Sequence, residues 1–428
     1  MADPSHDSHP HPSLTHPEAP VSASILPEGF DLTDPAVLEQ RVPHEELLLL
    51  RQNAPVSWVD QAPEAHAGLP EGYWAVSRHE DVLAVSKDST SFSTRENGVI
   101  IRFAADMTRD QVEATREMVI NHDPPDHTRL RNIISRGFTP RAVEALRAGL
   151  QERTDRILHE AREKGSGDFI TDIAAELPLQ VIADLLGVPQ EDRHKIFDWS
   201  NEMMIFDDPD FGQDPTVASA ELLAYFMALA EDRQRDPRDD IVTKLVKGDA
   251  AGNALTADEF GFFVILLSVA GNETTRTAIA HGMNAFFDHP DQWELYKRER
   301  PATTVDEIIR WATPVTVFQR TALTDVEIGG QLVPKGDRVG LFYASANFDE
   351  SVFAAPYRFD IRRDPNPHLA FGGHGAHYCI GANLARVEID LIFNAIADIV
   401  PDIHKTREPR RVRHAWVNAL KDLPVSYV

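Results

Sequence analysis

The sequence contains a single cysteine, Cys379, among its 428 residues. No intrachain disulfide can form, and a zinc or iron–sulfur site with several cysteine ligands is excluded. Basic residues are also scarce: 42 Lys and Arg stand against 68 Asp and Glu, which gives a formal net charge of −26. This balance argues against a broad surface for nucleic acid or an anionic membrane, because phosphate neutralisation needs an excess of Lys and Arg. We expect an intracellular protein with a cytoplasmic location.

Long hydrophobic runs are absent too, and the first residues carry no targeting pattern. The longest apolar stretch, Phe260–Ala270, is shorter than the roughly 20 residues that a helix needs to cross a bilayer. The first 20 residues have neither a basic segment nor an apolar core, so we expect no secretory signal. Residues 1–27 are rich in Pro, His and Ser, which predicts a disordered leader. A metal-binding tail is the alternative, and its histidines would be His6, His9, His11 and His16.

Helical periodicity dominates residues 28–428, which we expect to form a single domain because no repeat and no Pro-, Gly- or Ser-rich linker divides them. Helices are predicted over residues 78–85, 125–137, 142–163, 173–186, 218–233, 257–287 and 304–311. Strands are predicted over residues 72–77, 319–323, 326–329, 338–343, 416–420 and 424–428. The predicted fold class is therefore mostly α with small β-sheets.

Cys379 lies in a glycine-rich segment, Phe371-Gly-Gly-His-Gly-Ala-His-Tyr-Cys-Ile-Gly381, directly before a helical pattern over residues 383–394. Glycines let a backbone approach another group closely, and the N-terminal end of a helix stabilises a thiolate. Such a thiolate serves as a nucleophile, a redox sensor or a metal ligand, and an inert buried cysteine is the structural alternative. A nucleophile would need His377 as its base, yet residues two apart in a loop rarely meet in that geometry. A metal ligand needs only the metal and N–H donors to its sulfur, which this loop supplies.

The pattern Phe-Gly-Gly-x-Gly-x-His-x-Cys-x-Gly resembles the haem-ligand loop of the cytochromes P450, the haem-thiolate monooxygenases. By this resemblance Cys379 is the axial ligand to the iron of haem b. The resemblance covers residues 26–428, and it implies a triangular helical domain with a long distal helix over the haem and the Cys379 loop beneath it. In this loop the residues that it places at the cofactor are Phe371, Gly372, Gly381 and, beside a haem propionate, His377.

The long helix predicted over residues 257–287 is interrupted by Ala270-Gly-Asn-Glu-Thr-Thr275, a cluster that is costly in an ordinary core helix. Glycine inside a helix costs about 1 kcal/mol relative to alanine, and a buried unpaired carboxylate costs more. The cluster resembles the distal acid–alcohol pair of the family, where the helix bulges to admit O2 and water. Ala270 and Gly271 would then lie over the haem, and Glu273 and Thr274 would relay protons. A polar helix face with incidental threonines is the alternative.

Glu307-Ile-Ile-Arg310 places opposite charges at i and i+3 on one helix face. Alone this pair means little, because such surface pairs contribute about 0.2–0.5 kcal/mol and are common. It resembles the structural Glu-x-x-Arg pair of the family, which an arginine before the ligand loop completes. The sequence offers Arg358, in Pro356-Tyr-Arg-Phe359, as that third member.

A second motif precedes the distal helix. The segment Asp123-Pro-Pro-Asp-His-Thr-Arg-Leu-Arg131 places His127 and Arg131 at i and i+4 on one helix face, which suits a dianionic group. In the family such residues bind a haem propionate, and Arg320 is another candidate for this role.

Several longer stretches are similar to the actinobacterial steroid side-chain monooxygenases, which oxidise the terminal methyl of cholesterol or cholest-4-en-3-one. These stretches are residues 96–100, 134–142, 270–276, 311–320, 345–350 and 377–386. The sequence departs from that branch in its leader and at Ile101, where the branch has proline. We expect an apolar channel that orients a sterol by shape and burial. Its candidate lining residues, each equally a candidate for ordinary core, are Val99, Ile100, Ile101, Phe103, Val269, Val315, Val317 and Trp416.

The resemblance implies O2 as co-substrate and electrons from a separate ferredoxin and its NAD(P)H-dependent ferredoxin reductase, since no Gly-x-Gly-x-x-Gly follows a predicted strand. An acidic ferredoxin would need a local basic face near Cys379, and the candidates are Arg129, Arg136, His374 and Arg386. Other interpretations stay open. The chain is alternatively an H2O2-driven peroxygenase, a cytochrome P450 for a fatty acid, terpenoid or other steroid, or a non-catalytic haem- or lipid-binding protein.

Overall fold

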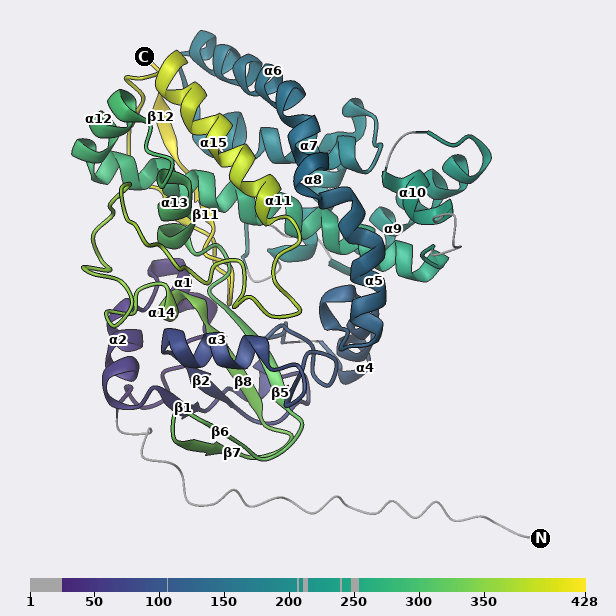
Figure 1. The fold of residues 1–428 in the computed structure, drawn as a ribbon, viewed down its shortest axis with the longest axis vertical. Coiled ribbons are helices and arrows are strands. Elements are labelled where there is room, and N and C mark those ends of the chain that lie inside the picture. The colour runs from purple at the N-terminus through teal and green to yellow at the C-terminus, as the bar shows by residue number, and fades with distance from the viewer. Residues whose placement is uncertain (1–24, 106, 206–207, 211–214, 239–240, 248–253) are drawn as a thin grey trace.

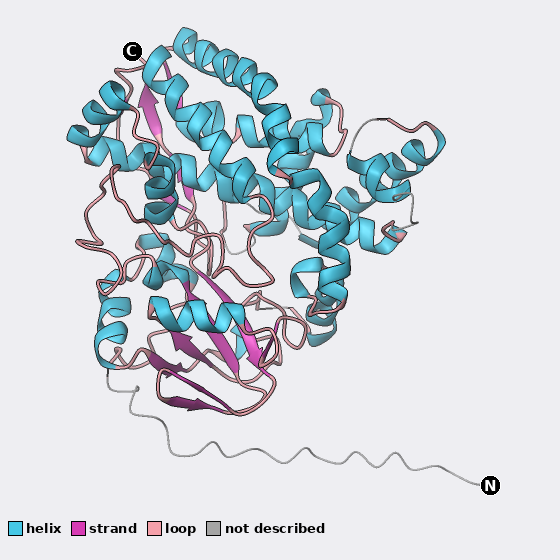
Figure 2. Cartoon of the chain, in the orientation of Figure 1, coloured by secondary structure: helices cyan, strands magenta, loops and turns pink. Residues whose placement is uncertain are grey.

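The computed structural model describes residues 25–105, 107–205, 208–210, 215–238, 241–247 and 254–428. Helices dominate it, and the largest group of strands lies at one end of the molecule (Figures 1 and 2). The predicted leader falls outside the described residues except for residues 25–27. In the described part of the chain, no helix is both long and apolar enough to cross a membrane.

The α-helices follow one another as α1 (Pro35–Gln40), α2 (His44–Asn53), α3 (His79–Lys87), α4 (Arg109–Ala114), α5 (Asp126–Ile134), α6 (Pro140–Lys164), α7 (Glu176–Leu185), α8 (Arg193–Met204), α9 (Pro215–Arg235), α10 (Ile241–Lys247), α11 (Ala257–Asp288), α12 (Pro290–Glu299), α13 (Thr304–Ala312), α14 (Tyr343–Ala346) and α15 (Ala382–Ile399). Short 3₁₀ turns lie at η2 (Pro63–Ala65), η3 (Thr115–Glu117), η4 (Val119–Asn121), η5 (Ser135–Phe138) and η7 (Gln190–Asp192), and a π-helical turn at η6 (Ile170–Ala174).

Capping residues explain where the long helices begin. Thr256 opens α11 with a reciprocal capping box, in which its hydroxyl accepts from the Glu259 N–H and the Glu259 carboxylate accepts from the Thr256 N–H. Thr139 caps α6 by accepting from the Ala142 N–H at 3.2 Å, so α6 begins at Pro140, two residues before the predicted start. The predicted boundaries hold to within a few residues for the long helices. The helix predicted from residue 173 differs, because its first part belongs to the π-helical turn η6.

The main sheet has the strand order β1 (Val56–Val59), β2 (Tyr73–Val76), β8 (Arg338–Phe342), β5 (Val317–Ala322) and β3 (Phe92–Ser93). Only β2 and β8 pair in parallel, with Trp74 opposite Val339. The smaller sheets pair β4 (Ser166–Asp168), β12 (Pro424–Ser426) and β9 (His404–Lys405), β10 (Arg410–Arg411) with β11 (Leu420–Asp422), and β6 (Val326–Ile328) with β7 (Gln331–Val333). The strand predicted over residues 416–420 is largely wrong: Val417 makes only an isolated bridge to Val315, and β11 begins at Leu420.

Helix α11 is the centre of the helical part. It packs against α7, α8, α9, α13 and α15, and it crosses the molecule behind α15 in Figure 1. Its apolar residues belong to the largest buried cluster, together with residues of α6, α7 and α15. A second and a third cluster lie around the main sheet. The segment just before α15, which carries Cys379, is therefore fixed between the helical core and the sheet region.

Candidate active site

The Cys379 loop is held in place by its own backbone and by α3. The Cys379 N–H donates to the Phe371 carbonyl at 2.9 Å, and Gly372 has φ +86°, a conformation that favours glycine. A Cβ on Gly375 would lie 1.7 Å from the Ser86 carbonyl oxygen on α3. The predicted close approach of a glycine is therefore partly an approach to α3.

The Cys379 side chain is exposed to an internal cavity, which it lines. Burial within the molecule raises the pKa of the thiol, while the Gly381 N–H, Arg131 and Arg386 lower it. The net effect is a raised pKa of the free thiol, while the N–H donor and the two cations act in the opposite direction and would support a thiolate once a metal binds it.

The cavity lies between this loop and α11. From α11 it is lined by residues three to four positions apart, as one helix face requires: Phe263, Leu266, Leu267, Ala270, Gly271, Thr274, Thr275 and Ala278. The predicted cofactor residues of the loop, which are Phe371, Gly372, His377 and Gly381, all line the same cavity. The structure therefore brings the distal cluster and the cysteine loop to opposite walls of one space.

A group of basic side chains forms another wall. His127, Arg131, Arg320 and His377 all line the cavity, and the rings of His127 and His377 lie 4.1 Å apart. In the described part of the chain, no carboxylate forms an ion pair with Arg131 or Arg320. Burial, then the Arg131 charge, lowers the pKa of His127 to about 4; burial, then Arg320, lowers the pKa of His377 to about 2. The buried guanidinium of Arg320 and the partly buried one of Arg131, neither with an ion-paired carboxylate among the described residues, favour an anionic ligand at this wall.

The two predicted proton-relay residues differ in position. Thr274 lines the cavity, and its hydroxyl donates to the Ala270 carbonyl at 2.8 Å. Glu273 does not line the cavity; it is buried, its carboxylate pairs with Arg276, and it accepts from the Thr277 hydroxyl at 3.4 Å. The threonine is therefore the group in contact with the reaction space, and the acid lies behind it.

Helix α11 is continuous through residues 257–288, so the polar cluster does not divide it into two helices. Gly271 lines the cavity, but a Cβ there would lie 2.3 Å from Cδ1 of Ile182 on α7. Its small size therefore serves the close packing of α7 on α11 as well as the cavity.

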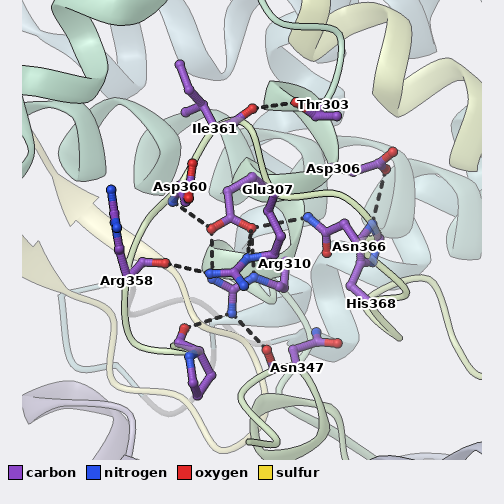
Figure 3. A network of polar contacts seen from close by, with 12 residues as sticks. Thr303, Asp306, Glu307, Arg310, Asn347, Arg358, Asp360, Ile361, Asn366 and His368 are labelled. Carbon is purple, nitrogen blue, oxygen red and sulfur yellow. Dashed lines mark hydrogen bonds and ion pairs between the residues drawn. The ribbon is translucent and has the colours of Figure 1, made fainter. Parts of the chain in front are cut away.

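Glu307 and Arg310 form a fully buried ion pair beneath the site, with Arg310 Nε and Nη2 each donating to the carboxylate at 2.8 Å. The third member predicted from the sequence, Arg358, is wrong. Its side chain is exposed and points away from Glu307 (Figure 3). Arg363 instead donates to Glu307 Oε2 at 3.0 Å. Arg358 contributes its backbone carbonyl, which accepts from Arg363 at 2.9 Å. Residues 358–363 contain three arginines, and the sequence alone does not show which of them faces Glu307.

The same network reaches the cysteine loop through Asn347. The Asn347 carbonyl accepts from Arg310 Nη1 at 2.8 Å, and its side-chain oxygen accepts from the Leu369 N–H at 2.6 Å. Leu369 stands two residues before Phe371, at the start of the loop. The buried ion pair therefore anchors the segment that presents Cys379.

Two of the predicted channel residues, Val99 and Val315, line the cavity, and the others do not. Phe103 packs instead with Leu69 and Val112 in a small separate cluster. The other predicted residues that do not line the cavity are Ile100, Ile101, Val269, Val317 and Trp416, and most belong to or pack on the cluster beside the main sheet. An apolar side chain is equally suited to the core or to a cavity wall, and its sequence position does not distinguish the two, which explains these errors.

Several cavity residues were missed by sequence reasoning. The apolar ones include Ile120, Phe138 and Phe318, which carry no motif. Glu388 on α15 is the notable polar one: it is buried, its Oε2 has no hydrogen-bond partner, and burial raises its pKa to about 8. An acidic residue among apolar helical residues, nine positions after Cys379, was the sequence signal that pointed to Glu388.

The residues around the cavity fit haem b. Cys379 offers a single thiolate for the iron, the helix face around Ala270 gives a smooth apolar cover, and the four basic side chains match two propionates. No group of three or more His, Cys, Asp or Glu suited to a different metal site occurs among the described residues. The iron of the cofactor would therefore be held by the cysteine, and its carboxylates by the basic wall.

Comparisons with known proteins agree with this site. Residues 302–397 match the family described as Cytochrome P450. The chain is 58% identical over 410 residues to a steroid C26-monooxygenase of Rhodococcus jostii, covering 96% of this chain and 87% of the relative, and 55% identical to one of Mycobacterium tuberculosis, covering 95% and 94%. A solved Mycobacterium marinum cytochrome P450 in complex with pseudoionone superposes with a TM-score of 0.86 at 35% identity, covering 94% of this chain and all of that one. The chain therefore belongs to the cytochrome P450 family and is a monooxygenase that uses haem b.

Proposed function

We propose that this enzyme hydroxylates the terminal side-chain methyl of a steroid, with cholesterol or cholest-4-en-3-one as the preferred class of substrate. The observation that carries the proposal is the apolar wall of the cavity, joined to 58% identity with a relative named as a steroid C26-monooxygenase. Away from the basic wall, most lining side chains are aliphatic or aromatic, and the polar ones are Thr274, Thr275, Cys379 and Glu388. A sterol side chain gains its binding free energy there from burial, about 25 cal/mol per Å² of apolar surface.

Haem b held by the Cys379 sulfur would supply the chemistry for activating O2 and oxidising an unactivated C–H bond. The protein's contribution is positioning. The loop holds the Cys379 sulfur toward the cavity, and Arg131 and Arg320 with the two histidines hold the propionates. Val99, Val315 and the α11 face orient the apolar substrate and exclude water.

Protons reach the cavity through α11 in this proposal. The Thr274 hydroxyl is the proton-carrying group on the wall, at Oγ1. Glu273 re-supplies it after its carboxylate leaves Arg276, since the ion pair holds the acid away from the cavity.

We propose an acidic ferredoxin as the electron donor, docking on the face that presents the cysteine loop. His374 is exposed there and its ring stacks on Tyr378. Arg129 is half-exposed and forms an ion pair with Glu259, so a partner must compete with that acid. Arg386 is unsuited to docking because it is partly buried, donates to Asp306 at 2.9 Å and lies over the Phe371 ring.

Arg136→Glu should slow reduction by ferredoxin without changing substrate binding, and an unchanged rate would refute this docking face.

The test of the function is turnover with defined components. Purified haem-loaded enzyme is incubated with cholest-4-en-3-one, a ferredoxin, its reductase and NADH, and products are identified by mass spectrometry. We expect the terminal alcohol or the acid derived from it, and none from Cys379→Ala. Absence of sterol product together with turnover of a fatty acid would overturn the steroid assignment.

A parallel reaction with H2O2 in place of the electron donors tests the peroxygenase alternative. The proposal predicts that it yields much less product than the reduced system. Tight sterol binding without product under either condition would instead favour a non-catalytic lipid-binding protein.

A further inference from the structure

A second cavity, of about 320 Å³, lies on the far side of α13 from the haem cavity. None of its described lining residues is shared with the haem cavity. It is partly open to solvent and is lined by the end of α1, the start of α2, α11, the end of α13, α14 and β10, together with Phe348 and Tyr357 after α14. The two cavities are neighbours along the chain, because Thr313 lines the second and Pro314 lines the first.

Arg411, a partly buried cation that pairs with no carboxylate among the described residues, lines this cavity. Arg411 Nε donates to the Leu38 carbonyl at 2.6 Å and Nη2 donates to the Asn418 side-chain oxygen. Nη1 has no hydrogen-bond partner in the described part of the chain, and no carboxylate there pairs with this guanidinium. Desolvation lowers the pKa of Arg411 to about 10. Nη1 is not among the buried atoms without a partner, so it is accessible from the cavity, and an anion that enters can accept a hydrogen bond from it.

Two neutral histidines accompany the arginine. Burial, with smaller contributions from Arg51 and Arg411, lowers the pKa of His44 to about 4, and burial, then Arg411, lowers that of His281 to about 3. His281 Nε2 donates to the Asn418 carbonyl at 2.6 Å, whereas His44 Nδ1 is buried without any partner. His44 therefore offers a second polar atom, and no acidic side chain lines the described part of the cavity.

The remaining walls are aromatic. The Trp311 and Phe348 rings lie 5.8 Å apart, the Phe348 and Tyr357 rings stack at 5.5 Å, and the His44 ring lies 4.3 Å from Phe348. Flat apolar surfaces of this kind pack against a compact apolar ligand body. An apolar cavity of about 150 Å³ already holds a benzene molecule, so this space accommodates an aromatic acid.

We propose that this cavity binds a small organic monocarboxylate, whose carboxylate pairs with Arg411 and whose apolar body packs against Trp311 and Phe348. The arginine selects for the negative charge, and the aromatic walls select an organic acid over an inorganic anion. This binding site is independent of the steroid assignment, because it uses none of the residues of the haem cavity.

The test is calorimetric titration of the haem-loaded enzyme with sodium benzoate, in the presence of saturating cholest-4-en-3-one. Steroid occupies the haem cavity, and the haem absorption spectrum is recorded to verify that benzoate leaves it unchanged. We expect saturable binding, weakened about tenfold or more in Arg411→Met, since a hydrogen bond to a charged group contributes roughly 1.5–3 kcal/mol.

Because Arg411 also makes structural hydrogen bonds, a second variant keeps the test decisive. Gln40→Glu adds a carboxylate at the exposed rim, where it competes for Arg411, and should weaken benzoate about fivefold or more. Gln331→Glu, on β7 and outside the cavity, adds the same charge and should change the affinity less than about twofold.

Three results would overturn the proposal. Absence of saturable binding excludes the site. Equal affinity for the neutral analogue benzyl alcohol shows that the cavity binds ligands by apolar shape alone, without a contribution from the Arg411 charge. Equal competition by sodium phosphate shows that Arg411 binds any anion and that the aromatic walls play no part.

Discussion

Replacement of Arg363 and of Arg358 by alanine separates the two candidates for the third member of the buried ion-pair network. Arg363 is nearly buried, and its guanidinium donates to Glu307 Oε2 and to the carbonyls of Ala354, Ala355 and Arg358 at 2.8–3.2 Å. Its removal leaves the fully buried Glu307 with one cation instead of two.

The expected magnitudes follow from burial. Loss of one partner from a buried ion pair costs about 3–5 kcal/mol, and we expect the lower end for Arg363→Ala because Arg310 still holds Glu307. Arg358→Ala should change the free energy of unfolding by less than about 0.5 kcal/mol, since its exposed side chain is lost while its carbonyl remains.

Urea denaturation of the haem-loaded protein, followed by circular dichroism and by haem absorbance, measures both variants. In a Glu307→Gln background the cost of Arg363→Ala should shrink, because the charge that it serves is gone. A destabilisation by Arg358→Ala equal to or larger than that of Arg363→Ala would refute the assignment.

Three further predictions concern the cavity. Glu388→Gln should be stabilised relative to wild type more at pH 8 than at pH 5. Burial raises the folded-state pKa of Glu388 to about 8 from 4.5, so wild type loses stability as the pH rises through this window, by at most roughly 5 kcal/mol. Equal pH profiles of the two proteins in urea denaturation would contradict this. Thr274→Ala should lower product formed per NADH consumed, by up to roughly two orders of magnitude, with little change in the steroid-induced spectral shift; an unchanged ratio would exclude the hydroxyl from proton delivery. Val315→Ala should weaken steroid binding about tenfold, whereas Phe103→Ala should lower only the thermal midpoint, and the opposite pattern in spectral titrations would reverse their placement.

Much of the fold was predictable from the sequence because its long helices carry strong local signals. Capping residues such as Thr139 and Thr256 and sustained apolar periodicity place α6 and α11 within a few residues. The strand predicted over residues 416–420 failed because its apolar residues are buried in a loop against the sheet region, where Val417 makes an isolated bridge instead of a ladder.

The site was predictable where a motif fixes both residue type and spacing. Cys379, two glycines of its loop, Gly372 and Gly381, and His127 with Arg131 one helical turn later all line the cavity. Choices that depend on tertiary direction were not predictable: Arg363 rather than Arg358 faces Glu307 because the chain turns between them. The same holds for the cavity lining, where an apolar side chain is equally suited to core or channel.

The central claim is that the Cys379 thiolate ligates haem iron in this cavity. The absorption spectrum of the reduced carbon monoxide adduct tests it most directly, with wild type and Cys379→Ala compared at equal haem content. The account predicts the strongly red-shifted Soret band of a thiolate ligand in wild type and its loss in the variant. A wild-type adduct without the shifted band, or a variant that retains it, would contradict the account.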